Sequence, residues 1–446
     1  MKIDLAFAEE LVSQTVKKGA DQAEVYIKSF KNLSVDVKGQ AVDSLTSSLS
    51  HGYSLRVIKN NRLGFAHATD LNEKASVIAQ AIGSAAYSDE DIWLGLPESS
   101  APAQVEIYDP ALADLQEDNA INLAMLLEKS AFDEDSRIKK VRKASGSFTN
   151  AETLIVNSKS VKAHYRSTSC SAQIMAIAED GQESQTGWDF SASRFLRDVS
   201  FEKTGKTAAE RAVQLLGAKT ITGTRTGIIL DNSVTIDFLG IFASSFSSDS
   251  LQKGKSLLKD KLGKKIISDK LNIIDSGLLS GKLGSSPVDA EGVTTREKFL
   301  VREGVLQGYL YNTYTARKGN THSTGNASRG SYSSLPSVGV TNLFIEPSSA
   351  GDSPGKKELF KALGRGLYIV DAMGVHTANP ISGDFSLGVT GLWIEDGEIR
   401  FPVKEAAISG NIIEFFNKVA AAGDDLIFYG SMGAPSLLIA DVDVSA

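Results

Sequence analysis

The chain has 446 residues, which is too long for one ordinary hydrophobic core and predicts two or three domains. Hydrophobic residues make up 42% and charged residues 23%, a balance typical of globular proteins. Glycine is frequent (39) and proline is scarce (10), which favours turns and hairpins over extended linkers. The net charge of −7 argues against direct binding of nucleic acid, because proteins that bind it usually present a basic surface.

The cellular compartment is inferred from cysteine use and from the first residues. Cys170 is the single cysteine, so no disulfide forms within the chain and nothing favours an oxidising compartment. The segment Met1-Lys2-Ile3-Asp4 becomes acidic before any apolar stretch begins, unlike a secretory signal peptide. No stretch approaches the ~18 uncharged apolar residues of a spanning helix. A cytoplasmic protein without a membrane segment is therefore expected.

Helix and strand signals alternate in the first part of the chain. Period-two alternation of apolar residues predicts strands, Asn60-Asn61 predicts a hairpin turn, and apolar residues three and four apart predict helices. The segment Asp91–Pro110 holds three prolines and several serines and is expected to be a loop. The predicted elements are a helix from Leu5 to Gly19, strands over Ala23–Ser29, Leu33–Val37, Tyr53–Lys59 and Arg62–His67, and helices over Leu71–Tyr87 and Ala113–Phe132.

β-forming residues return after this helix and lead to the main domain boundary. The polar, threonine-rich segment Lys219–Arg225 is the expected connector between two domains. We predict an N-terminal domain over residues 1–218, which a break near residues 91–112 could divide into two subdomains, and a C-terminal domain over residues 222–446. The predicted elements before the connector are strands over Ile138–Phe148, Thr153–Val156 and Val161–Ala178 and a helix over Thr204–Leu216.

The second half is predicted to be mostly strand and turn. Glu303-Gly304 and Asp396-Gly397 have strong hairpin character, and each separates two β-forming segments. The run Lys253–Lys265 holds six lysines and is interpreted as the solvated face of a helix. The fold class is α+β: two domains of antiparallel sheet with packed helices, the C-terminal domain being rich in strands. The other predicted elements are a strand over Gly227–Leu230 and helices over Val234–Phe246, Leu251–Leu262 and Ile412–Ala422.

A search for catalytic constellations finds none that is complete. None of the five histidines is followed by glutamate, and no two lie within two helical turns of each other, so the spacing supports no zinc site. Cys170 lies in a β-forming run and is interpreted as a buried apolar residue rather than a nucleophile. The S-x-x-K and K-T-G matches occur in the wrong order, and S-D-N and G-x-S-x-G are absent. The residues alone therefore predict no catalytic residue, no metal and no cofactor.

Several segments of the second half resemble one known family. The longest is Gly383–Ile399, which reads G-D-F-S-L-G-V-T-G-L-W-I-E-D-G-E-I. By these segments the chain resembles the TldD/PmbA peptidase family, whose genes have also been linked to control of DNA gyrase. The resemblance covers essentially the whole chain, and its second half is the specific part. The other segments are Pro287–Val293, Tyr314–Lys318, Ser323–Ala327 and Gly433–Ser436.

The resemblance implies one of the two branches of that family. The TldD branch carries H-E-x-x-x-H on a helix early in the C-terminal domain, where two histidines and a later cysteine bind zinc and the glutamate is the general base. The corresponding helix here is expected near Val234–Phe246 and holds neither histidine nor glutamate, and Cys170 is the only cysteine. The run Gly383–Ser386 has the form typical of the PmbA branch, also called TldE.

Membership of the PmbA branch would imply a subunit that pairs with a TldD-type zinc peptidase and helps to enclose a proteolytic chamber without supplying the metal. Such a pair degrades or trims peptides, and an unfolded peptide would bind as an added strand at a sheet edge. The isolated chain is then expected to be inactive, with no catalytic residue, metal or cofactor of its own. The residues predicted to line the peptide groove are Asp289, Glu291, Asp384, Phe385 and Ser386.

Two other interpretations stay open. One is a homodimer that binds a peptide or another ligand and hydrolyses nothing. The other is an enzyme whose unrecognised site uses Asp289, Glu291, Asp384 or His376, although turn chemistry explains the acidic residues as well. For the dimer, the apolar run Leu392–Ile394 beside a hairpin turn predicts either an interface through Trp393 or a strand buried in its own domain.

Overall fold

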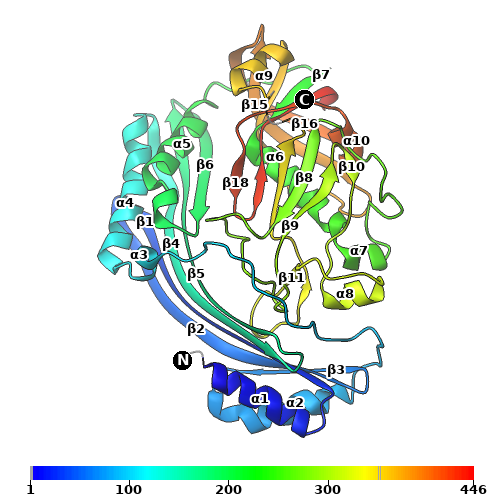
Figure 1. Cartoon of the computed structure of the whole chain (residues 1–446). Coiled ribbons are helices and arrows are strands. Elements are labelled where there is room, and N and C mark those ends of the chain that lie inside the picture. The colour runs from blue at the N-terminus through cyan, green and yellow to red at the C-terminus, as the bar shows by residue number, and fades with distance from the viewer. Residues whose placement is uncertain (1–3, 350, 352, 446) are drawn as a thin grey trace.

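The computed structural model describes residues 4–349, 351 and 353–445. Residues 1–3, which carry part of the argument against a signal peptide, lie outside this range; Asp4 lies within it and caps the first helix by accepting from the Ala6 N–H. The described residues form three six-stranded sheets and one two-stranded sheet. One long, curved sheet comes from the first half of the chain, and the second half is nested against its inner face (Figure 1).

The curved sheet has the strand order β3-β2-β1-β4-β5-β6, and every neighbouring pair is antiparallel. Its central strands are unusually long because segments predicted as separate strands run on without a break. Ala23–Ser29 and Leu33–Val37 both belong to β1, for example. The strands are β1 (Gln22–Lys38), β2 (Ala41–Lys59), β3 (Arg62–Ala68), β4 (Ile138–Asn157), β5 (Lys162–Asp180) and β6 (Glu183–Ser193).

Helices cover the outer face of this sheet at its two ends (Figure 1). Odd-numbered residues of β1, such as Val25 and Val35, are buried on this outer side in two apolar clusters with the helices. Even-numbered residues therefore point to the inner face, because side chains alternate along a strand. The helices are α1 (Leu5–Lys17) and α2 (Lys74–Ala85) at one end, and α3 (Pro110–Ala113), α4 (Glu117–Glu134) and α5 (Phe201–Val213) at the other.

The second half contains the other two six-stranded sheets, with the orders β10-β9-β8-β13-β19-β18 and β16-β15-β14-β7-β20-β17. Most pairs are antiparallel as predicted, but β7 and β14 are parallel, as are β13 and β19. The strands are β7 (Thr224–Leu230), β8 (Leu271–Ser276), β9 (Glu297–Arg302), β10 (Val305–Leu306), β13 (Asn342–Pro347), β14 (Gly366–Met373), β15 (Asp384–Glu395), β16 (Glu398–Asn411), β17 (Val419–Ala422), β18 (Ile427–Tyr429), β19 (Met432–Ala434) and β20 (Leu437–Ser445), with β11 (Ala327–Ser328) and β12 (Ser337–Val338) as a small pair.

Helix α6 (Asn232–Ala243) contacts both large sheets of the second half and anchors its core. The rings of Phe238 and Phe385 are 5.0 Å apart between centroids, as are those of Phe238 and Phe415. All three belong to one apolar cluster that spans both sheets. Within the described residues no helix is long and apolar enough to cross a membrane. The other helices of this half are α7 (Ser248–Gln252), α8 (Thr313–Lys318), α9 (Lys356–Leu363) and α10 (Ile412–Asn417).

Local turn chemistry is where sequence and structure agree best. The predicted hairpin turns Asn60-Asn61, Glu303-Gly304 and Asp396-Gly397 join β2 to β3, β9 to β10 and β15 to β16. Both residues of each turn have positive φ, between 47° and 75°. Two-residue hairpins need this left-handed backbone, which asparagine, aspartate and glycine adopt most readily.

Two predicted helices of the second half need correction, and the burial of Trp393 bears on an alternative that the sequence left open. The helix predicted over Leu251–Leu262 is wrong: α7 ends at Gln252, and Gly254 and Asp260 have φ values of 69° and 60° that interrupt a right-handed helix. The last helix ends at Asn417 rather than Ala422, because the chain continues there as β17. Trp393 is 5% exposed and stacks on Phe401 inside its own half, so the run around it is a buried strand.

Candidate functional site

A buried ion cluster joins the inner face of the curved sheet to the second half. Arg56 on β2 donates to Glu24 on β1 at 2.7 Å and to Glu291 at 2.8 Å. Arg329, which follows β11, also donates to Glu24. The three exposed fractions are 7% for Arg56 and 1% for each glutamate. Such charges are stable away from water only when they are paired, so this cluster fixes the two halves together.

Asp289 and Glu291, both predicted to line a peptide groove, lie at this junction. Asp289 accepts hydrogen bonds from the backbone N–H groups of Glu291, Val293 and Ala327, at 2.9, 3.0 and 3.0 Å. Burial, together with the charge of Glu291, raises its pKa. The pKa of Glu291 is instead held below its usual range. Burial alone would raise it, but the charge of Arg56 and the hydrogen bond from the Thr313 N–H outweigh that effect. Both carboxyl groups are thus already bound by the protein itself, and their part in peptide binding stays a prediction.

The remaining predicted groove residues lie elsewhere, at the start of β15. Asp384 is exposed and accepts from the Asn411 side chain at 3.0 Å, and this hydrogen bond lowers its pKa. Phe385 is 5% exposed and belongs to the aromatic core around α6, whereas Ser386 is exposed. His376 is also exposed. Asp384 and Glu291 belong to different parts of the second half, so the five predicted residues do not form one continuous group.

A second polar cluster fixes α6 against the first half. Asp231 caps α6 by accepting from the N–H of Ser233 at 3.2 Å, and it lies 3.6 Å from the Arg211 guanidinium of α5. Arg211 also contacts Asp189 of β6 at 3.2 Å, and the Tyr429 hydroxyl donates to Asp189 at 2.9 Å. Burial raises the pKa of Asp189, while Arg211 opposes that rise. The N-terminus of α6 is therefore held by residues from both halves.

Asp237 is the ionisable residue of α6, and sequence reasoning missed it. Its side chain is exposed, on a helix whose other face fills the aromatic core. Surrounding protein removes part of its hydration and the nearby Asp371 of β14 adds repulsion, which together raise the pKa of Asp237 to about 6. The Trp188 indole N–H of β6 approaches Asp371 at 3.5 Å. Only folding brings Asp237 and Asp371 together, so no sequence motif signals this pair of carboxyl groups.

Three family models match the chain in order along its length. They are described as PmbA/TldA metallopeptidase domain 1, central domain and C-terminal domain, and they match residues 23–86, 110–216 and 222–446. Together the three matches span most of the chain, and each model is described as a domain of a metallopeptidase. The chain belongs to the PmbA/TldD family.

Relatives and solved structures agree with this assignment. The chain is 31% identical to a metalloprotease PmbA homolog of Buchnera aphidicola subsp. Acyrthosiphon pisum, with 95% of this chain and 92% of the relative covered. It is similar to a structure from Thermotoga maritima MSB8, named provisionally as a modulator of a DNA gyrase, with 27% identity, a TM-score of 0.91 and 99% of both chains covered. TldE from Thermococcus kodakarensis shares the fold, with a TM-score of 0.89, 21% identity and 99% and 100% of the chains covered.

The residues present do not fit the zinc site that the family's catalytic branch implies. Helix α6 occupies the expected place, but it offers Asp237 and neither histidine nor cysteine. Cys170 lies in β5 in the first half, and burial raises the pKa of its thiol to about 12, which opposes the thiolate that zinc needs. Within the part of the chain that the structure describes, no three His, Cys, Asp or Glu side chains gather to hold a metal.

The pKa of Asp237 gives a prediction about pH. A carboxyl group whose pKa is raised on folding contributes stability that is complete below its unfolded value of about 3.9 and is lost as pH rises through the folded value. Asp237→Asn is therefore expected to be more stable than the unchanged protein above pH 6 and to remove this loss between about pH 4 and pH 6. Urea unfolding across this pH range measures it, with the exposed Asp43→Asn as the matched control.

Carboxyl carbon NMR tests the cause directly. Asp371→Asn is expected to move the pKa of Asp237 part of the way back toward its ordinary value, because repulsion by Asp371 is the second cause of the shift after dehydration. A titration of Asp237 that is the same with and without Asp371 would show that the two carboxyl groups do not interact.

Proposed function

We propose that this chain is the non-catalytic, PmbA-type subunit of a peptidase complex. In this proposal it pairs with a TldD-type subunit that binds zinc, in the cytoplasm, and the pair cleaves unfolded proteins or matures peptides. Residues 1–218 and 222–446 act as its two domains. The observation that carries the proposal is the composition of α6, which has no histidine, glutamate or cysteine. The resemblance to the TldD branch would set the zinc-binding helix at this position, where such ligands are required.

Family membership supports peptide-bond hydrolysis as the reaction of the complex, and the packing of α6 supports a subunit that does not bind the metal. Relatives of this chain are named metalloproteases, which points to hydrolysis of peptide bonds by the complex. The inward face of α6 is occupied by Phe238 and Phe242, which are fully buried in the aromatic core. A metal and an activated water would need polar ligands where this helix has apolar packing. The chain is therefore proposed to contribute structure and peptide contacts while its partner contributes the metal.

Mixing experiments test the proposal. The isolated chain is expected to cleave no unfolded casein and to hold no stoichiometric zinc after dialysis, since α6 lacks ligands for it. Addition of a TldD-type partner is expected to give cleavage that a chelator abolishes. Peptide release measured by mass spectrometry reports activity, and elemental analysis reports zinc.

A partner subunit whose general-base glutamate is replaced by glutamine provides the matched control, and it should give no cleavage when mixed with this chain. Chelator-sensitive cleavage by the isolated chain, or one tightly held zinc per chain, would contradict the proposal. Peptide binding by a homodimer that never responds to a TldD-type partner would favour the alternative of a binding protein without hydrolase activity.

A further inference from the structure

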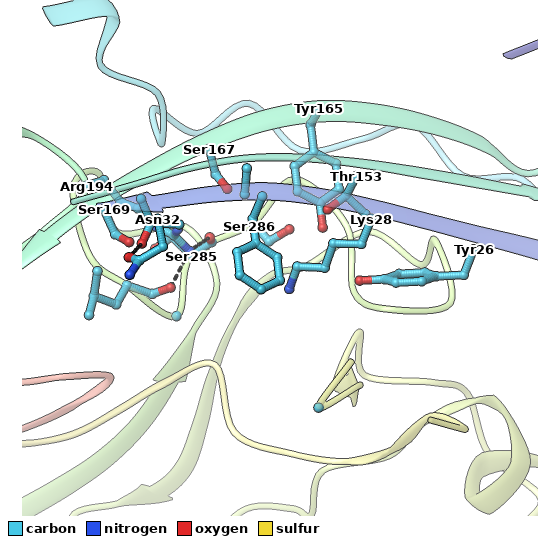
Figure 2. Close-up of a pocket in the computed structure, with 16 residues that line it drawn as sticks. Tyr26, Lys28, Asn32, Thr153, Tyr165, Ser167, Ser169, Arg194, Ser285 and Ser286 are labelled. Carbon is cyan, nitrogen blue, oxygen red and sulfur yellow. Dashed lines mark hydrogen bonds between the residues drawn. The ribbon is translucent and has the colours of Figure 1, made fainter. Parts of the chain in front are cut away.

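A polar pocket lies between the inner face of the curved sheet and the loops of the second half (Figure 2). Its volume is about 450 Å³, which is in the size range of small-molecule sites. The side chains of Tyr26 and Lys28 project from β1 into this space, and that of Tyr165 projects toward it from β5 (Figure 2). The loop Leu283–Ser286 closes one side. The pocket is thus assembled from both halves of the chain.

Strand register explains why these side chains meet. The residues paired across β1, β4 and β5 form three rows, since each strand contributes every second residue to the inner face. The first row contains the only charged side chain of the nine, that of Lys28. The rows are Lys28, Thr153 and Tyr165; Phe30, Ala151 and Ser167; and Asn32, Thr149 and Ser169.

The charges that line the pocket have one sign. Lys28 and Arg194 both contribute to its wall, and none of its lining residues is an aspartate or glutamate. Arg194 donates to the backbone carbonyl groups of Thr168, Leu283 and Ser285, and its buried Nε has no hydrogen-bond partner among the described residues. Lys28 makes no ion pair within the described part of the chain. Two cations therefore face a shared space without a compensating negative charge.

The pKa shifts of these two side chains also indicate an uncompensated positive charge in the pocket. Burial, and then the charge of Arg194, lowers the pKa of Lys28. Burial also lowers the pKa of Arg194. An anion placed between them would relieve this repulsion, and the hydroxyl groups of Ser167 and Ser169 lie on the same wall as hydrogen-bond donors.

We propose that this pocket binds the free carboxylate of a short peptide, with Lys28 as its charged partner and the hydroxyl groups of Ser167 and Ser169 as donors. The choice of an oxyanion as the ligand group follows from the two positive charges of the pocket, Lys28 and Arg194. The choice of a peptide rests on the proposed function. Tyr26, Tyr165 and Phe30 give the same wall aromatic surface on which the apolar part of a peptide can pack.

Binding to the isolated chain tests this inference by isothermal titration calorimetry. The probes are the tripeptide Ala-Phe-Ala with a free carboxylate, the same peptide as its C-terminal amide, and inorganic phosphate. The free acid is expected to bind at least about tenfold more tightly than the amide. Lys28→Met is expected to weaken binding of the free acid by at least about tenfold, whereas Lys28→Arg, which keeps the charge, is expected to retain most of it.

The matched control is Lys31→Met, because Lys31 lies on β1 but faces the outer side of the sheet. It is expected to bind like the unchanged chain, and thermal unfolding confirms that each variant is folded. Equal binding of acid and amide, no binding of either, or binding of phosphate alone would overturn the proposal. The assay needs no partner subunit, so its failure is distinct from a failure of the proposed peptidase complex, which the mixing experiment detects.

Discussion

Replacing Arg56 with methionine is expected to lower the free energy of unfolding by ~3–5 kcal/mol. Arg56 donates to Glu24 and Glu291, each of which is 1% exposed. Methionine fills a similar volume but leaves Glu291 as a buried carboxylate without its cation. Glu24 keeps Arg329, so the main loss falls on the contact between the curved sheet and the second half. Urea unfolding followed by circular dichroism gives the free energy.

Lys140→Met is the control for this measurement. Lys140 lies on β4 of the same sheet and pairs with Glu179, but the two side chains are 68% and 33% exposed. Exposed ion pairs contribute little, so the control is expected to cost no more than ~1 kcal/mol. Similar losses for the two variants would show that the buried cluster does not join the halves in the way its geometry indicates.

The second large effect is expected on association with the partner subunit, when the free edge of β2 is changed. Strand β3 pairs with β2 only over Tyr53–Lys59, and residues 41–49 of β2 are exposed throughout. Leu45 and Leu49 are 42% and 62% exposed on this segment. An uncovered edge strand with apolar side chains is a template for pairing with another chain, and we expect a strand of the TldD-type partner to occupy it. Lysine at both positions should weaken the complex by at least about tenfold.

Sedimentation of the mixed subunits at micromolar concentration measures this association, and cleavage of unfolded casein should fall with it. Leu262→Lys is the control, since Leu262 is likewise exposed, at 58%, but lies in a turn and so offers no strand edge for pairing. Unchanged association of the Leu45→Lys, Leu49→Lys double variant would place the interface elsewhere. The buried position of Trp393 already removes that side chain as an exposed anchor.

Much of the secondary structure was predictable because its signals are local. The three hairpin turns depend on residues that tolerate positive φ, and α6 depends on Asp231 as a cap and on continuous apolar sequence. The predictions that failed lacked such signals or misread them. The run Lys253–Lys265 has the composition of a solvated helix, but Gly254 and Asp260 take left-handed backbone there. Propensity summed over a window cannot foresee such breaks, because contacts with the rest of the fold decide them.

For the candidate site too, some features follow from local sequence and others only from long-range contacts. The sequence by itself determined the family segments and the lack of zinc ligands on α6, because such a motif lies within a few residues of one helix. Only the tertiary structure decided that Arg56 meets Glu291, 235 residues away, or that the charge of Asp371 acts on Asp237. Period-two alternation places Lys28 on one face of β1, but it does not say what covers that face. The register of β1, β4 and β5 sets which side chains lie beside Lys28, and a loop from the second half covers them. Both are long-range contacts, which form only when the chain folds.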